Sequence, residues 1–240
     1  MAKNPDITGS KFTSTTHNAP YAAIDPQNAT LPSQYHVCIM GASRDIGANI
    51  AYAFAQAGAA TIVICAPQSE ISISAIPTRL ASLNPSTRLL YLPCNVTVEA
   101  EVQTFAAQVR AHLGHLDVLI YNAGYFGAWA TRAASTPHDF SAALEVNCKG
   151  LFLATHVFLP ALRQGPRGGE SAIVSICSTG MHATGGPNTN TAYGISKLAQ
   201  CRFIEMLAAR ESDVFAAAVH PGHVKTEMGK VAPKELFDCK

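Results

Sequence analysis

Short apolar runs alternate with stretches of helical periodicity from Tyr35 onward. The first run, residues 35–40, leads through a glycine-containing turn into a helical pattern over residues 46–57. Further strand candidates cover residues 60–65, 89–92, 116–121, 172–177 and 214–219. Parallel strands need crossover connections, which are usually helices. The alternation therefore predicts an α/β fold: a doubly wound, mainly parallel sheet of about six strands with helices on both faces.

The organisation along the chain predicts a single domain preceded by a leader. Residues 1–34 are rich in Thr, Asn, Pro and Ser, show no period, and are interpreted as a polar leader without chemistry, lying over the domain surface. Residues 35–240 form the domain. Ligands of doubly wound sheets bind at the carboxyl ends of the strands, so chemistry is expected where the strand candidates end.

The amino-acid composition excludes several classes of function. With 48% hydrophobic residues, 14% charged residues and a formal charge of +1 without a basic run, the chain is neither disordered throughout nor a nucleic-acid binder. Its seven cysteines are odd in number and form no CxxC, so we expect reduced thiols and no metal site. No apolar run approaches a membrane span and no signal peptide is present, so we expect a cytoplasmic protein without a membrane partner.

The turn after the first strand has the setting of a phosphate-binding turn. It reads Met40-Gly41-Ala42-Ser43-Arg44-Asp45-Ile46-Gly47 and opens a helix. Glycines there let backbone N–H groups approach a pyrophosphate at the positive helix end, although a tight turn without a ligand has the same outline. We expect Asp45 to cap the helix through its side chain and to compete with phosphate, a repulsion that Arg44 partly offsets.

A tyrosine and a lysine carry the second signal. Tyr193 and Lys197 are spaced i, i+4, so on a helix both point into the same cleft. A nearby ammonium favours the phenolate and lowers the pKa of the phenol toward the working range of an acid or base. The same spacing also occurs on solvated helix faces. Here it opens the helix after the fifth strand, which runs out at Ser178.

Together these motifs resemble the short-chain dehydrogenase/reductase family over about residues 35–228. The family's turn reads Thr-Gly-x-x-x-Gly-x-Gly, and this chain departs from it at Met40 and Asp45. Further matching segments are Asn122-Ala123-Gly124, residues 144–150, and the Pro-Gly loop at residues 220–228. The resemblance implies a Rossmann-type fold that binds NAD or NADP and interconverts a carbonyl and an alcohol on a small molecule.

The resemblance also implies the roles of the catalytic residues. Tyr193 donates a proton to the carbonyl oxygen, and Ser178 polarises that oxygen, with Thr179 as the less favoured substitute. Lys197 lowers the pKa of Tyr193 and holds the nicotinamide ribose. Asn147 anchors a water that connects Lys197 to solvent.

The same comparison implies the cofactor site and the preference for NADP(H) over NAD(H). No carboxylate follows the second strand at Cys65-Ala66-Pro67 to hold a ribose hydroxyl, and Arg44 is basic. His220 and His223 are given structural or substrate-edge roles. The expected cofactor-binding residues are Gly41, Ser43, Arg44, Ile46, Gly47, Asn95 (to adenine), Asn122, Tyr193, Lys197, Val224 and Thr226.

Two departures keep alternatives open. The chain continues from Gly222 only to Lys240, where family members carry lid helices and a seventh strand, so we expect an exposed sixth strand, an open substrate pocket and a homo-oligomer. The leader resembles that of some fungal members, which suggests secondary metabolism. The alternatives to the oxidoreductase are a redox-inactive binding protein, favoured by Asp45 and Asn95, and a dehydratase or cyclase using the same pocket.

Overall fold

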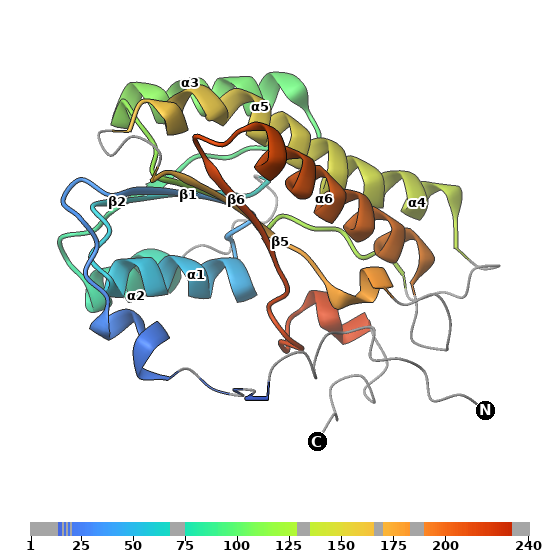
Figure 1. Ribbon diagram of the computed structural model, residues 1–240, viewed down its shortest axis with the longest axis horizontal. Coiled ribbons are helices and arrows are strands. Elements are labelled where there is room, and N and C mark those ends of the chain that lie inside the picture. The colour runs from blue at the N-terminus through green and yellow to red at the C-terminus, as the bar shows by residue number, and fades with distance from the viewer. Residues whose placement is uncertain are drawn as a thin grey trace.

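Six parallel strands form one sheet in the order β3-β2-β1-β4-β5-β6 (Figure 1). The computed structural model describes residues 14, 15, 17, 19, 21–67, 75–128, 135–165, 170–182 and 190–231. The strands are β1 His36–Met40, β2 Thr61–Cys65, β3 Arg88–Tyr91, β4 Val118–Tyr121, β5 Ala172–Ile176 and β6 Phe215–Val219. All six predicted strands are confirmed, with ends that differ by one or two residues.

Helices cover both faces of this sheet. They are α1 Asp45–Gln56, α2 Ala75–Leu83, α3 Glu99–Leu113, α4 Pro137–Leu144, α5 Gly150–Arg163 and α6 Thr191–Arg210. Figure 1 shows α1 and α2 on one face and α3 to α6 on the other. This arrangement confirms the predicted doubly wound fold of Rossmann type.

The core lies in two layers because successive side chains of a strand point to opposite faces. In β1, Val37 and Ile39 pack with the α1 and α2 side, whereas Cys38 and Met40 pack with the α3 and α5 side. All five residues of β1 are buried. This two-sided burial explains why the strand reads as a continuous apolar run.

A π-helical turn, Glu145–Lys149, joins α4 to α5 without a break. The resulting run from Pro137 to Arg163 is long and apolar enough to cross a membrane by length and composition alone, which a count of consecutive apolar residues overlooked. Core helices of globular proteins meet the same criterion. Leu151, Phe158 and Leu162 of this run are buried in the core cluster beside the sheet.

Part of the predicted leader lies against α1. Its described residues include two short 3₁₀ turns, Ala22–Ile24 and Pro26–Asn28. The Leu31 amide donates to the Ala57 oxygen at 3.0 Å, and the Leu31 side chain packs on the apolar layer under α1. The contacts of Leu31 attach the described end of this segment to the domain, and the leader and its boundary at residue 34 stay predictions.

The strand order reverses direction between β1 and β4. The chain leaves β1 toward β2 and β3 and returns to the other side for β4, β5 and β6. Connections that leave in opposite directions open a crevice at the carboxyl ends of these two strands. The predicted site residues follow those strand ends.

Candidate active site

The turn between β1 and α1 is packed too tightly for side chains at two glycines. A Cβ on Gly41, where φ is +84°, would lie 2.5 Å from the Ala123 backbone, and one on Gly47 would lie 2.3 Å from the Gly41 oxygen. Asn122 reinforces the packing because its Nδ2 donates to the Gly41 oxygen at 2.5 Å. The turn is thereby fixed against the end of β4.

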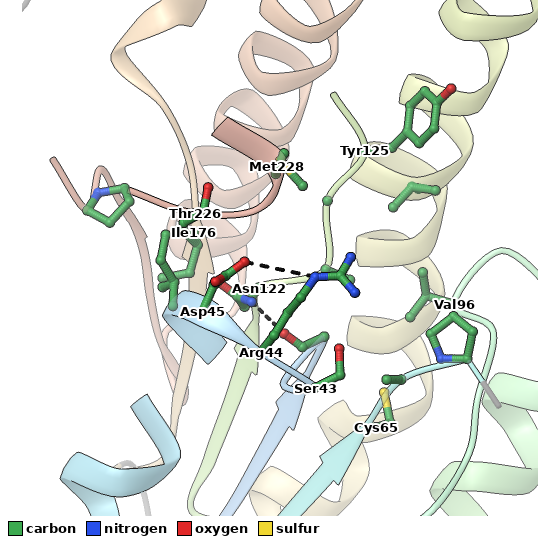
Figure 2. A pocket seen from close by; sticks show the side chains of 18 of the residues that line it. Ser43, Arg44, Asp45, Cys65, Val96, Asn122, Tyr125, Ile176, Thr226 and Met228 are labelled. Atoms are coloured by element: carbon green, nitrogen blue, oxygen red, sulfur yellow. Dashed lines mark hydrogen bonds and ion pairs between the residues drawn. The ribbon is translucent and has the colours of Figure 1, made fainter. Parts of the chain in front are cut away.

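Asp45 does not cap α1. The N-cap is Arg44, without a side-chain cap bond, and Asp45 has a φ of +50°. Its Oδ2 instead accepts from the Glu227 amide at 3.0 Å and lies 3.9 Å from Arg44 Nε. The expected cap is wrong because the left-handed backbone turns the carboxylate toward the loop after β6. Figure 2 shows it between Arg44 and the loop that carries Thr226.

A cavity of about 270 Å³ opens at the carboxyl ends of the strands. Within the described residues its wall contains one acid, Asp45, and two cations, Arg44 and Lys197. The predicted site residues in the wall are Gly41, Ser43, Arg44, Ile46, Asn95, Asn122, Tyr193, Lys197 and Thr226.

Four predicted residues lie outside this wall. Gly47 shapes the turn from behind, and Asn147 is fully buried beneath it. Ser178 follows the end of β5, where its Oγ accepts from the Gly180 amide at 3.1 Å, and its side chain acts to lower the pKa of Tyr193. Val224 is not a wall residue and is 42% exposed, so the structure does not bring it to the predicted nicotinamide position.

Tyr193 lies in the first turn of α6, where Asn190 Oδ1 accepts from its amide at 3.1 Å. Its ring packs with its centroid 4.7 Å from that of the Phe126 ring. Burial raises the pKa of Tyr193 to about 12, against a lowering by the nearby Ser178 side chain. The expected lowering of this pKa by Lys197 is therefore absent from this arrangement.

Lys197 is directed at the backbone. Its Nζ donates to the Ile176 oxygen at 2.8 Å and lies 5.6 Å from the centroid of the Tyr193 ring. Its side chain is buried, and this burial lowers the pKa of Lys197 to about 8. The Lys197 ammonium thus binds the end of β5, and the residue also lines the cavity.

Asn147 lies in the π-helical turn, and its amide group is fully used by the protein. Its Oδ1 accepts from the Tyr125 amide at 2.8 Å. Its Nδ2 donates to the Tyr125 oxygen at 3.0 Å and to Ser196 Oγ at 2.8 Å. Asn147 therefore joins the loop after β4 to α6, next to Lys197.

The adenine side differs from its prediction in one respect. Asn95 lines the cavity, but its Oδ1 already accepts from the Thr97 amide at 3.1 Å and from Thr97 Oγ1 at 2.9 Å. The oxygen assigned to adenine is thus engaged in a local turn. Beside it, Cys65 and Cys94 are buried in the wall, and the neighbouring Cys94 thiol together with burial raises the pKa of Cys65.

His220 reaches the end of β5. Its ring nitrogens lie 3.4 Å from the Thr179 amide and 3.3 Å from Thr179 Oγ1, and burial lowers the pKa of His220. His223 packs against it at 5.9 Å. Across the described ranges, no group of three or more His, Cys, Asp or Glu residues is arranged to hold a metal ion.

Several wall residues had no predicted role, among them Tyr125 and Met228. Tyr125 lines the cavity, its backbone holds Asn147, and its hydroxyl donates to Asp139 at 2.7 Å. Met228 closes the wall from the loop after β6. The position of Tyr125 directly after Asn122-Ala123-Gly124 was the only available signal for it.

These features fit a dinucleotide. The close-packed glycines leave the backbone of the turn open to the cavity at the positive end of α1, and Arg44 and Lys197 supply positive charge. The carboxylate of Asp45 is the one feature of the wall that opposes an anion.

The family model of short chain dehydrogenases matches residues 35–236. The short chain dehydrogenase mpl6 of Monascus purpureus is 34% identical over 235 residues, covering 96% of this chain and 78% of the relative. The short chain dehydrogenase andI of Emericella variicolor is 32% identical over 230 residues, covering 94% of this chain and 76% of the relative.

Solved structures agree with this assignment. A short chain dehydrogenase of Burkholderia cenocepacia in complex with NADP superposes with a TM-score of 0.72 at 27% identity, covering 81% of this chain and 76% of that one. The NADP complex of Pseudomonas aeruginosa RhlG shares the fold, with a TM-score of 0.74 at 24% identity, covering 84% of this chain and 77% of that one. The chain therefore belongs to the short-chain dehydrogenase family of NAD(P)-dependent oxidoreductases.

Proposed function

We propose that this protein interconverts a carbonyl and an alcohol on a small organic molecule with NADP(H). The observation that carries the proposal is the placement of Tyr193 and Lys197 together in the wall of the cavity, with Ser178 near enough to act on the pKa of the Tyr193 phenol. An acid within hydrogen-bonding reach of a bound carbonyl is what this chemistry requires. The bound nicotinamide supplies or accepts the hydride.

In this proposal, each of four residues has a different role in the reaction. With a pKa of about 12, Tyr193 keeps its proton at neutral pH and is able to donate it to a carbonyl oxygen. Ser178 has the proposed role of polarising the same oxygen through its hydroxyl. Lys197, with a pKa near 8, stays mostly charged at pH 7 and holds the end of β5 while facing the cavity. Asn147 fixes Ser196 and Tyr125 on either side of this group.

The preference for NADP(H) is supported by charge. Arg44 lies in the wall, and no acid follows β2 through Pro67, where an NAD site would place one. The two solved relatives described above were captured with NADP.

Asp45 favours a second candidate, a binding protein without redox turnover. A carboxylate beside the cofactor's pyrophosphate weakens nucleotide binding by repulsion. Since Ser178, Tyr193 and Lys197 remain assembled, we place this alternative second.

We also extend the proposal to a cytoplasmic homo-oligomer in a biosynthetic pathway. The six described cysteines are all free, as in a reducing compartment, and the curated relatives are fungal. The exposed apolar side chains of Phe215 (63%) on edge strand β6, Phe152 on α5 and Leu198 on α6 support association. Light scattering over a range of protein concentrations measures the oligomeric state.

The test of the function is a nucleotide titration followed by turnover. NADPH and NADH are titrated at fixed salt against wild type by nicotinamide fluorescence, and a panel of ketones and aldehydes is then assayed with Tyr193→Phe as the matched control. Tighter binding of NADPH, together with turnover that the control loses, supports the proposal. Binding without turnover supports the redox-inactive alternative.

A further inference from the structure

Asp45 adopts an unfavourable backbone conformation. Its φ of +50° lies in the left-handed region, which costs a non-glycine residue about 1 kcal/mol. Asp and Asn tolerate this region better than other side chains do. Gln34, with a φ of 58°, is the other non-glycine residue with positive φ in the described part of the chain.

The carboxylate spans two segments that are 182 positions apart in the sequence. Its Oδ2 accepts from the Glu227 amide at 3.0 Å, joining the turn after β1 to the loop after β6. Glu227 lies between Thr226 and Met228, and both of these neighbours line the cavity. A restraint on the Glu227 amide therefore restrains two wall residues at once.

The loop is ordered locally in the same direction. Thr226 Oγ1 accepts from the Gly229 amide at 2.9 Å, and Met228–Val231 forms a 3₁₀ turn. The Glu227 carboxylate pairs with Lys230, on the same turn. These bonds shape the loop internally, whereas the bond to Asp45 attaches it to the turn after β1. Figure 2 shows Asp45 beside the loop that carries Thr226.

We propose that Asp45 is a positioning residue that fixes the loop after β6, and with it Thr226 and Met228, at the edge of the nucleotide cavity before any nucleotide binds. The restraint itself is a property of the chain alone. Its effect on the dinucleotide rests on the proposed function.

This placement has an electrostatic cost. The carboxylate stands beside the turn where a pyrophosphate would bind, and Arg44 Nε, at 3.9 Å, compensates only part of its charge. Asp45 therefore weakens nucleotide binding but holds the loop after β6 in place before a nucleotide binds. An Asn at position 45 keeps an acceptor oxygen and tolerates the backbone conformation, but carries no charge.

The first test uses the protein without nucleotide. Hydrogen exchange of the Glu227 amide, followed by NMR, is compared in wild type, Asp45→Asn and Asp45→Gly, with Gln34→Gly as the matched control for relief of a positive φ. We expect Asp45→Gly to exchange at least about tenfold faster, because the acceptor is lost. Asp45→Asn and Gln34→Gly stay near wild type. Unchanged exchange in a folded Asp45→Gly overturns the proposal.

The second test separates this inference from the proposed function. If NADPH binds, the Asp45→Asn variant binds it about fivefold more tightly than wild type because the repulsion is lost. The affinity of this variant also depends less on the salt concentration. Asp45→Gly, equally uncharged, binds less tightly than Asp45→Asn because its loop is free. Equal affinities in the two variants contradict the positioning role. If no variant binds nucleotide, the proposed function fails, while the exchange experiment still decides whether Asp45 holds the loop.

Discussion

Lys197 Nζ donates at 2.8 Å to the backbone oxygen of Ile176, the last residue of β5. No carboxylate contributes to the pKa shift of this ammonium, and the groups that oppose the lowering are the thiols of Cys177 and Cys148. A buried lysine held by a carbonyl rather than by a charge is costly to the fold. The residue most useful to the proposed chemistry is therefore one that destabilises the protein.

Replacing Lys197 by Met is expected to raise stability at neutral pH and to abolish turnover. The pKa of Lys197 falls from 10.5 to about 8 on folding. Below pH 8 the penalty is complete, on the order of 3 kcal/mol, and between pH 8 and 10.5 it is relieved as the folded lysine loses its proton first. Urea unfolding of both proteins at pH 7, 8, 9 and 10 measures the difference. A pH-independent difference would contradict the burial argument.

Wild type itself is expected to lose stability above about pH 9, where thiols of the unfolded chain ionise. Burial raises the pKa of Cys38 and of Cys65, so the folded state retains protons that the unfolded state releases. Each such thiol contributes a fall of about 1.4 kcal/mol per pH unit. Cys38→Ala removes one of them, so its free energy of unfolding falls less steeply between pH 9 and 10.5. Parallel slopes in the two proteins would argue against this assignment.

Tyr193→Phe is expected to lower carbonyl reduction by about a hundredfold or more, because the proton donor is lost. The Phe variant keeps the ring that packs against Phe126, so the fold around the site is retained. Nucleotide affinity should change by less than about threefold. Steady-state kinetics and an NADPH titration of the same preparation measure both quantities. A large fall in affinity with unchanged turnover would assign Tyr193 to binding alone.

Gly47→Ala is expected to destabilise the fold by about 2 kcal/mol or more, because the new Cβ meets the Gly41 oxygen and the Ala42 backbone. Gly58→Ala is its control. Gly58 has a φ of +91° but no neighbouring atom within 4 Å, so only the conformational cost of about 1 kcal/mol applies. Chemical denaturation of both variants ranks them, and equal losses would show that contact at Gly47 is not the cause.

Asn147→Ala is expected to cost about 2–4 kcal/mol of stability, since it leaves the Tyr125 amide and oxygen and Ser196 Oγ without their partner. Ser196→Ala loses one of those bonds together with its own donation to the Tyr193 oxygen, and should cost less. Thermal and urea unfolding measure both. If Asn147→Ala lost activity while keeping full stability, Asn147 would act only in the reaction.

The fold was predictable because buried parallel strands are continuous apolar runs, and the helices between them have a different period. The cavity residues followed from the same logic, since motifs placed at strand ends meet at one edge of the sheet. Tyr193 and Lys197 were predictable from helical spacing. Their pKa values were not, because burial and the Ile176 oxygen depend on how α6 docks on β5.

The remaining differences have local causes. A sequence pattern does not show that position 45 takes a positive φ, which directs its carboxylate away from α1. Nor does it show that Asn95 uses its oxygen on Thr97. The π-helical turn at residues 145–149 is equally hidden, because its residue types suit an ordinary helix.

The described thiols divide by accessibility, which makes them internal reporters. Cys38, Cys65, Cys94 and Cys177 are buried, whereas Cys148 and Cys201 are partly exposed. A thiol reagent in solution reacts with the second group in the native state and with the first only after the domain opens. The rate of the slow labelling phase therefore reports the rate of domain opening. A bound nucleotide slows this phase, so labelling measures nucleotide binding without any optical signal from the ligand.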